Sequence, residues 1–138
     1  MKIEIINELD KEFVKYINDQ LDKFNFVRWE VKEVKPLAIK VTDDNGKVIA
    51  GSASRSFGYW LLLDSLWVSE VMRGQDLGTK ILVQTEAAAK ARGCRYVLLD
   101  TLNFQARPFY EKHGYKVQWT QNNYPNENGC KYFMVKEI

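Results

Sequence analysis

The chain has 138 residues, of which 46% are hydrophobic and 28% are charged, a composition typical of a globular domain and not of a disordered segment. Its formal net charge is +2 and the basic residues are spread along the chain, which argues against a nucleic-acid-binding or membrane-surface protein. Two cysteines and one histidine provide no metal-ligand spacing and no disulfide framework. We therefore expect a soluble, cytoplasmic protein with no metal, no membrane span and no nucleic-acid partner.

The N-terminal part of the chain predicts a strand, a helix and a hairpin. Residues 2–6 alternate weakly in polarity, which favours an opening or edge strand. Apolar residues then recur at helical spacing over 9–24, with Asn7 as the expected N-cap. Residues 36–54 alternate with period two around a DDNG turn at 43–46, a pattern that predicts a β-hairpin.

The remainder predicts a βαβ unit followed by a short helix and two strands. Residues 59–68 form the most hydrophobic run, expected to be a central strand buried on both faces, and 96–100 form a second buried strand. The helix expected over 76–92 would connect them as parallel neighbours. A short helix at 105–113 and strands at 115–120 and 131–136 follow, the strands joined by a polar loop that we expect to be mobile.

These elements together predict an α/β fold. We expect a single domain spanning residues 1–138, with a mixed, mostly antiparallel sheet of six to seven strands. Three to four helices would flank this sheet. Polarity and spacing alone do not assign an activity to it.

A strand, a glycine loop and a helix follow one another over residues 66–82, which read LWVSEVMRGQDLGTKIL. Backbone N–H groups at the start of a helix lack partners and carry partial positive charge, so this layout predicts a phosphate site. The glycines do not have the GxxxxGK[ST] spacing of a P-loop. Neither the spacing nor the position fits the dinucleotide fingerprint GxGxxG.

The same segment resembles motif A of the GNAT superfamily of acyl-CoA N-acyltransferases, a strand reading LxV followed by [QR]xxGx[GA] and a helix. Leu66, Val68, Arg73 and Gly78 match that pattern. Asp76 replaces its central glycine, and its carboxylate would weaken anion binding unless it caps the helix or points to solvent. We interpret Asp76 as a helix N-cap.

A second segment, NFQARPFYEKHGY at 103–115, resembles motif B of the same superfamily, NxxAxxxYxKxGF. Two motifs in the expected order make the resemblance specific, and it covers the C-terminal half of the chain. The positions in register are Asn103, Ala106, Tyr110, Lys112 and Gly114.

The resemblance implies that acetyl-CoA, or another acyl-CoA, lies between the two parallel strands where their C-terminal ends splay apart. Tyr110 would protonate the leaving thiolate. The residues that it assigns to the acyl-CoA are Leu66, Val68, Arg73, Gly74, Gln75, Asp76, Gly78, Thr79, Asn103 and Tyr110.

Asp64 is the candidate general base, because it is the only charged residue in an apolar strand. A water chain is the alternative base. His113 is interpreted as a charge that favours a helix C-terminus and not as a base.

The expected function is transfer of an acyl group, in the first place acetyl, from acyl-CoA to a primary amine by direct attack in a ternary complex. The acceptor would be a small molecule or a protein, and its identity cannot be read from the sequence. A non-catalytic module that binds or senses acyl-CoA is the alternative. A homodimer through the last strands is left open.

Overall fold

The computed structural model describes all 138 residues, which divide into two compact units, Met1–Lys32 and Glu33–Ile138. The first unit contains the predicted helix, α1 (Lys11–Phe26). Asp10, and not Asn7, is its N-cap, because the Asp10 carboxylate accepts a 2.9 Å hydrogen bond from the amide of Phe13. The strand predicted at 2–6 is wrong, since these residues have no regular structure and pair with no strand.

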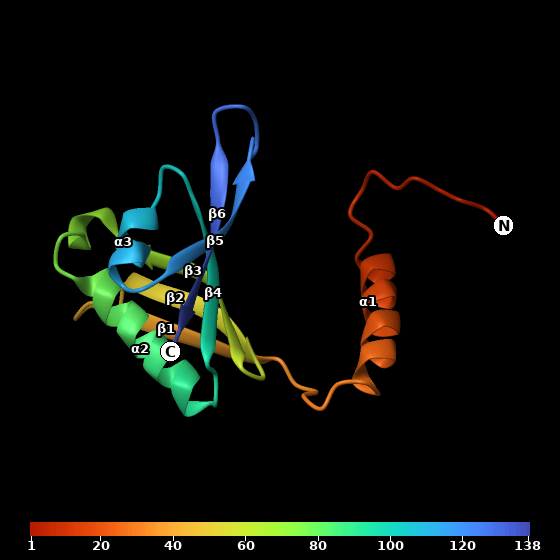
Figure 1. Cartoon of the computed structure of the whole chain (residues 1–138), viewed down its shortest axis with the longest axis horizontal. Helices are drawn as coiled ribbons and strands as arrows, with labels where there is room; N and C mark the ends of the chain where they lie inside the picture. Colours follow the sequence, from red (N-terminus) through yellow and green to blue (C-terminus); the bar gives the residue numbers. More distant parts are fainter. The chain divides into compact units, whose positions relative to one another are not determined.

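The second unit contains one six-stranded sheet with the order β1-β2-β3-β4-β6-β5 (Figure 1). Only β3 and β4 run parallel, and all other neighbours are antiparallel. The predicted mixed sheet with one parallel pair is therefore confirmed. The strands are β1 (Lys35–Thr42), β2 (Val48–Phe57), β3 (Trp60–Val68), β4 (Tyr96–Leu102), β5 (Lys116–Asn122) and β6 (Cys130–Glu137).

Two α-helices belong to the second unit, so the chain has three, as predicted. They are α2 (Leu77–Ala91), between β3 and β4, and α3 (Arg107–Lys112), between β4 and β5. A short 3-10 helix, η1 (Glu70–Met72), lies between β3 and α2. No helix of the chain combines the length and the apolar character that a bilayer crossing requires.

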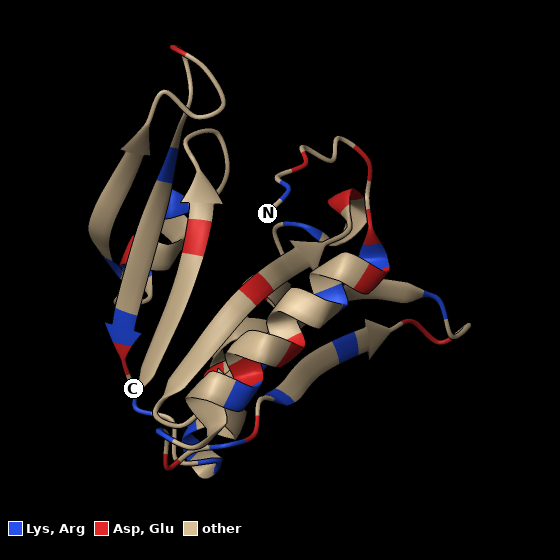
Figure 2. Ribbon diagram, turned by 90° about the vertical axis from the view of Figure 1, so that its right-hand side faces the viewer, with Lys and Arg blue, Asp and Glu red and all other residues tan.

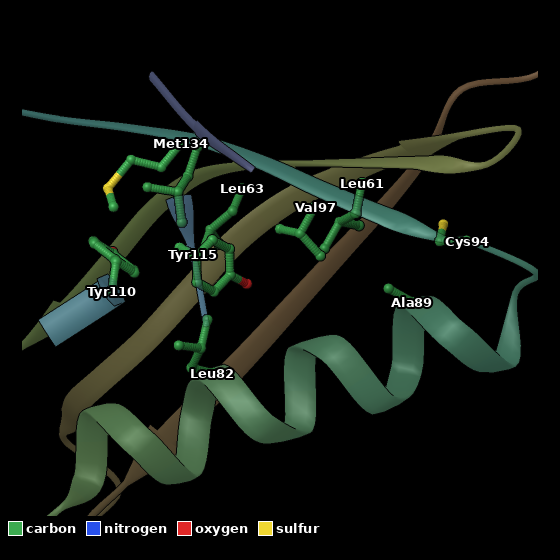
Figure 3. Close-up of a cluster of buried hydrophobic side chains, with 10 residues drawn as sticks. Leu61, Leu63, Leu82, Ala89, Cys94, Val97, Tyr110, Tyr115 and Met134 are labelled. Carbon is green, nitrogen blue, oxygen red and sulfur yellow. The ribbon is translucent and has the colours of Figure 1, made fainter. Parts of the chain in front are cut away.

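The core of the second unit lies between α2, α3 and one face of the sheet (Figure 3). Along β3, Leu61 and Leu63 are buried whereas Trp60 and Asp64 are exposed. The prediction that this strand is buried on both faces is therefore wrong. A run of large apolar residues does not by itself reveal how many faces are covered, because exposed surfaces also carry such residues.

Glu86 of α2 connects the helix to β6 and to Tyr115, the residue just before β5. Its carboxylate accepts a 3.0 Å hydrogen bond from the Tyr115 hydroxyl and forms a 2.7 Å ion pair with Lys136. The Glu86 side chain is only 14% exposed, so solvent cannot readily replace these partners. This cluster fixes α2 against β6.

We expect Glu86→Ala to lower the free energy of unfolding by about 2–3 kcal/mol, because it leaves a hydroxyl and an ammonium group without their partner in a shielded place. Urea denaturation followed by circular dichroism measures this change. The matched control is Glu111→Ala, which breaks an exposed ion pair with Arg107 and should cost less than about 0.5 kcal/mol. Equal losses in the two variants would contradict this assignment.

Candidate active site

The loop from β3 to α2 uses two residues in the left-handed region, Gly74 with φ +81° and Asp76 with φ +58°. Asp76 occupies the N-cap position of α2, but its side chain makes no capping bond to the backbone. Its carboxylate accepts a 3.4 Å hydrogen bond from the Thr79 hydroxyl instead. The interpretation of Asp76 as the N-cap is therefore confirmed for its position and wrong for its side chain. A side chain that caps a helix normally belongs to a residue with extended backbone geometry. Aspartate is one of the few residues that tolerate the left-handed conformation.

A cavity of about 670 Å³ opens at this loop, between the end of β3, the first turn of α2 and α3. Most residues assigned to acyl-CoA from the sequence line it, whereas Gln75, Asn103 and Tyr110 do not. Asn103 instead accepts a 3.5 Å hydrogen bond from the amide of Cys130. The assigned residues that do line the cavity are Leu66, Val68, Arg73, Gly74, Asp76, Gly78 and Thr79.

The parallel strands separate beside this cavity. The pairing of β3 with β4 ends at Leu63 and Leu99. On its other side, β3 has a bulge at Asp64, because Ser54 pairs with Leu63 and Ala53 pairs with Ser65. Beyond the bulge β3 pairs with β2 alone, so its edge toward β4 lacks a neighbouring strand.

A second cavity of about 360 Å³ opens at this separation. It shares Leu66, Gln105 and Ala106 with the first cavity, so the two meet between the ends of β3 and β4. The polar and aromatic side chains around it are Asp64, Asp100, Tyr110, Tyr124 and Lys131. The structure therefore brings Asp64 and Tyr110 together at one cavity, next to the cavity of the glycine loop.

Comparison with known proteins identifies this arrangement. Residues 37–117 match the family model described as an acetyltransferase (GNAT) domain. The chain belongs to the GNAT acetyltransferase family. It is therefore an acetyltransferase of the GNAT type, and the expected family and class of enzyme are confirmed.

Individual relatives of this GNAT acetyltransferase cover most of its length. An acetyltransferase of Agrobacterium fabrum is 32% identical over 83% of this chain and 84% of its own. The blasticidin-S acetyltransferase of Streptomyces morookaense is 31% identical over 80% of this chain and 84% of its own. The crystal structure of an acetyltransferase from Agrobacterium tumefaciens superposes with a TM-score of 0.91, at 28% identity, over 100% of both chains. At 19% identity, an aminoglycoside 6'-N-acetyltransferase complexed with coenzyme A shares the fold, with a TM-score of 0.67 over 97% of both chains.

Tyr110 is the buried phenol of the site in this GNAT protein. Its ring lies edge-on to Phe109 and to Tyr115, with centroids 5.2 and 5.6 Å away. Burial raises the pKa of Tyr110 above its usual value, and the negative charge of Asp100 adds to this effect. A phenol with a raised pKa stays protonated, which suits a proton donor.

Asp64 forms an ion pair with Arg55 on the neighbouring strand β2, with a distance of 3.3 Å. The two side chains are about half exposed, at 48% for Asp64 and 54% for Arg55. Exposed pairs of this kind are weak, so the carboxylate remains available to a ligand in the cavity. No group of three or more His, Cys, Asp or Glu side chains in the chain is arranged to hold a metal ion.

Sequence reasoning missed several residues that the structure places at the cavities. Asp100 is the clearest, because LLLD at 61–64 is followed by VLLD at 97–100 and each strand carries a single acidic residue (Figure 2). That repetition was a usable signal. Phe104 and Phe109 line the first cavity, and Tyr124 and Lys131 the second, without any such signal. Lys112 also lines the first cavity, and its match to motif B had marked the position without assigning it a role.

His113 contacts a residue that lines the first cavity. Its Nε2 atom is 3.1 Å from the hydroxyl of Thr79, in the first turn of α2. Only the packing of α3 against α2, which the sequence does not reveal, brings these two residues together.

Proposed function

We propose that this protein transfers an acetyl group from acetyl-CoA to the primary amine of an acceptor, by direct attack in a ternary complex. The observation that carries this proposal is the meeting of the two cavities between the ends of β3 and β4. One cavity has phosphate-binding features, and the other contains candidate acid and base groups. Two reactants held on either side of a shared opening can react without a covalent enzyme intermediate.

The pyrophosphate of acetyl-CoA would bind at the first turn of α2, where the backbone N–H groups are not capped by a side chain. Arg73 and Lys112 line this cavity and supply positive charge. The Arg73 Nε atom donates a 3.3 Å hydrogen bond to the carbonyl of Val68, which holds the side chain at the end of β3. The unpaired edge of β3 beyond the bulge offers hydrogen bonds to the pantetheine amides, as an added strand would use them.

The acceptor amine would enter the second cavity and attack the thioester carbonyl carbon near Leu66 and Ala106, which line both cavities. We assign Asp64, or a water chain, to accept the proton that the amine loses. The carbon–sulfur bond then breaks, and Tyr110 donates its phenolic proton to the coenzyme A thiolate. One amide bond forms and one thioester bond breaks. The ammonium group loses its first proton to Asp64, or to the water chain, before the attack, and the second proton of the nitrogen passes through solvent to the Tyr110 phenolate. Asp64 then releases its proton to solvent, so both side chains return to their starting state.

We also propose that the whole chain acts as one N-acetyltransferase domain in the cytoplasm. Support for one domain comes from the relative that superposes over 100% of both chains. Support for the compartment comes from Cys94 and Cys130, which are both free thiols.

Two measurements test the proposed function. Isothermal titration of acetyl-CoA into the purified protein should give a dissociation constant in the micromolar range. Release of the coenzyme A thiol should then depend on added primary amine. Binding without thiol release from any amine would indicate the sensing module, and no binding of acetyl-CoA or longer acyl-CoAs would overturn the proposal.

We expect Asp64→Asn to lower kcat/KM for the amine by about 100-fold at neutral pH, because the variant cannot accept the proton. The loss should shrink as the pH approaches the pKa of the amine, where the free base is abundant. A pH profile of the initial rate measures both effects. Asp44→Asn, at the exposed turn between β1 and β2, is the matched control. Its kcat/KM for the amine should equal that of wild type. A loss below about threefold in Asp64→Asn would assign the base to a water chain.

A further inference from the structure

Asp64 and Asp100 lie at corresponding places on the two parallel strands. Each follows directly on the last paired residues, Leu63 and Leu99, and each lines the second cavity. Asp64 lies 3.3 Å from its partner Arg55. Asp100 lies farther from its partner, at 3.9 Å from the ammonium group of Lys131. The cavity therefore contains a carboxylate whose ion pair is at the limit of contact.

The position of Lys131 shows that the surroundings of Asp100 bind a cation. It lies opposite Leu102 at the start of β6, and its ammonium group is 4.1 Å from the centre of the Tyr124 ring. A carboxylate on one side and an aromatic face on the other form a favourable site for a cation. The side chain of Lys131 is 20% exposed, so this ammonium group is partly shielded from water. The chain's own ammonium group thus fills a cation site inside the second cavity.

The loop between β5 and β6 fixes Tyr124 in this position. The amide of Tyr124 donates a 3.0 Å hydrogen bond to the carbonyl of Gly129, and the amide of Gly129 donates one of 3.0 Å to Asn126. A Cβ atom at Gly129 would lie 1.9 Å from the carbonyl oxygen of Tyr124, so only glycine permits this close approach. The aromatic wall of the cavity is therefore built by the loop itself.

We propose that the acceptor is a small amine with a second cationic group, and that Asp100 and Tyr124 bind this group in the place that the Lys131 ammonium otherwise fills. The inference rests on the proposed function, because the second cavity is taken as the acceptor site. Lys131 has a flexible four-carbon stem and can move its charge to solvent when the acceptor enters. An acceptor with a negative group would instead meet both Asp64 and Asp100, and the one ammonium group of the cavity, that of Lys131, is already beside Asp100. The cavity of about 360 Å³ admits a small molecule and not a folded partner.

Three amines of equal length test this proposal by binding: cadaverine with two amino groups, n-pentylamine with one, and δ-aminovalerate with a carboxylate in place of the second. Each is titrated calorimetrically into the protein at neutral pH, with and without saturating coenzyme A. We expect cadaverine to bind about tenfold more tightly than pentylamine, from one partly exposed ion pair and one cation–π contact. We expect aminovalerate to bind least tightly.

Two substitutions should act in opposite directions. Asp100→Asn should reduce the preference for cadaverine over pentylamine to about twofold or less, because the second cation loses its counter-charge. Lys131→Met keeps the apolar stem, removes the competing ammonium and should raise the affinity for cadaverine by about three- to tenfold. Glu127→Gln removes a carboxylate from the exposed tip of the loop between β5 and β6. It should change neither the preference for cadaverine over pentylamine nor the affinity for cadaverine.

Three results would each overturn the inference. The first is equal affinity for the three amines, and the second is no binding of cadaverine. The third is tighter binding of aminovalerate than of pentylamine that Lys131→Met abolishes. The last result would make Lys131 a receptor for an anionic acceptor. Failure of the proposed function is read separately, as failure of acetyl-CoA to bind. The preference among the amines is still measured on the protein without coenzyme A.

Discussion

Replacing Tyr110 by phenylalanine should lower kcat by about 100- to 1,000-fold, while the affinity for acetyl-CoA changes by less than about twofold. The substitution removes only the hydroxyl, and the ring keeps its edge-on contacts with Phe109 and Tyr115. Without the phenol, the thiolate must leave unprotonated or take a proton from water. The initial rate of thiol release at saturating acetyl-CoA and amine measures kcat, and calorimetric titration measures the affinity for acetyl-CoA.

The pH dependence follows from the direction of the Tyr110 pKa. The active form of a proton donor is the protonated one, so the rate falls as pH rises through its pKa. Burial raises the pKa of Tyr110 above the usual value of 10, and therefore the rate should not fall on the alkaline side before about pH 10. A fall of the wild-type rate well below that pH, if it is absent from Tyr110→Phe, would assign Tyr110 a lowered pKa and contradict its buried environment.

Tyr115→Phe is the matched control for this prediction. It also removes a buried phenol, but that hydroxyl donates to Glu86 at 3.0 Å and does not line either cavity. We expect a loss of stability and little change in kcat. A comparable fall of kcat in both variants would mean that Tyr110→Phe acts by disturbing the core and not by removing an acid.

The sequence predicted the parts of the site that local pattern determines. A strand, a glycine loop and a helix are contiguous, so the cavity around Gly74 and Gly78 could be located from residue spacing alone. Tyr110 lies in a short helix within a second contiguous motif, and the structure places it at the neighbouring cavity. Such features depend on a few adjacent residues and not on distant contacts.

The remaining parts depend on how distant segments pair. Strand β6 inserts between β4 and β5, which places Lys131 opposite Leu102 and beside Asp100. Nothing in the local polarity of residues 130–137 predicts this neighbour. The same limit explains the wrong strand at 2–6, where alternation was present but no partner strand exists. Strand pairing is a property of the whole sheet, whereas alternation is a property of one segment.

Gly78→Glu should weaken acetyl-CoA binding by at least about 100-fold, because its carboxylate would repel the pyrophosphate at the place where the uncapped N–H groups of α2 point. Gly78 lines the first cavity, and a Cβ atom there would meet the Phe109 ring at 3.5 Å and Val68 at 3.9 Å. These are ordinary van der Waals distances, so a Cβ atom fits at this position. Because Phe109 and Val68 occupy the space beside it, a longer side chain must extend into the cavity. Calorimetric titration of acetyl-CoA measures the loss.

Unfolding is not an alternative explanation for that loss. A negative charge in the first turn of α2 interacts favourably with the helix dipole, so the melting temperature of Gly78→Glu should not fall. Gly78→Ala fits the available space and should retain most of the affinity. Ala87→Glu places the same side chain on the exposed face of α2, away from both cavities, and should bind acetyl-CoA as wild type does. Unchanged binding of acetyl-CoA by Gly78→Glu would mean that the pyrophosphate does not bind at this loop. Equal losses of affinity in Gly78→Glu and Ala87→Glu would mean that the effect comes from the net charge of the protein.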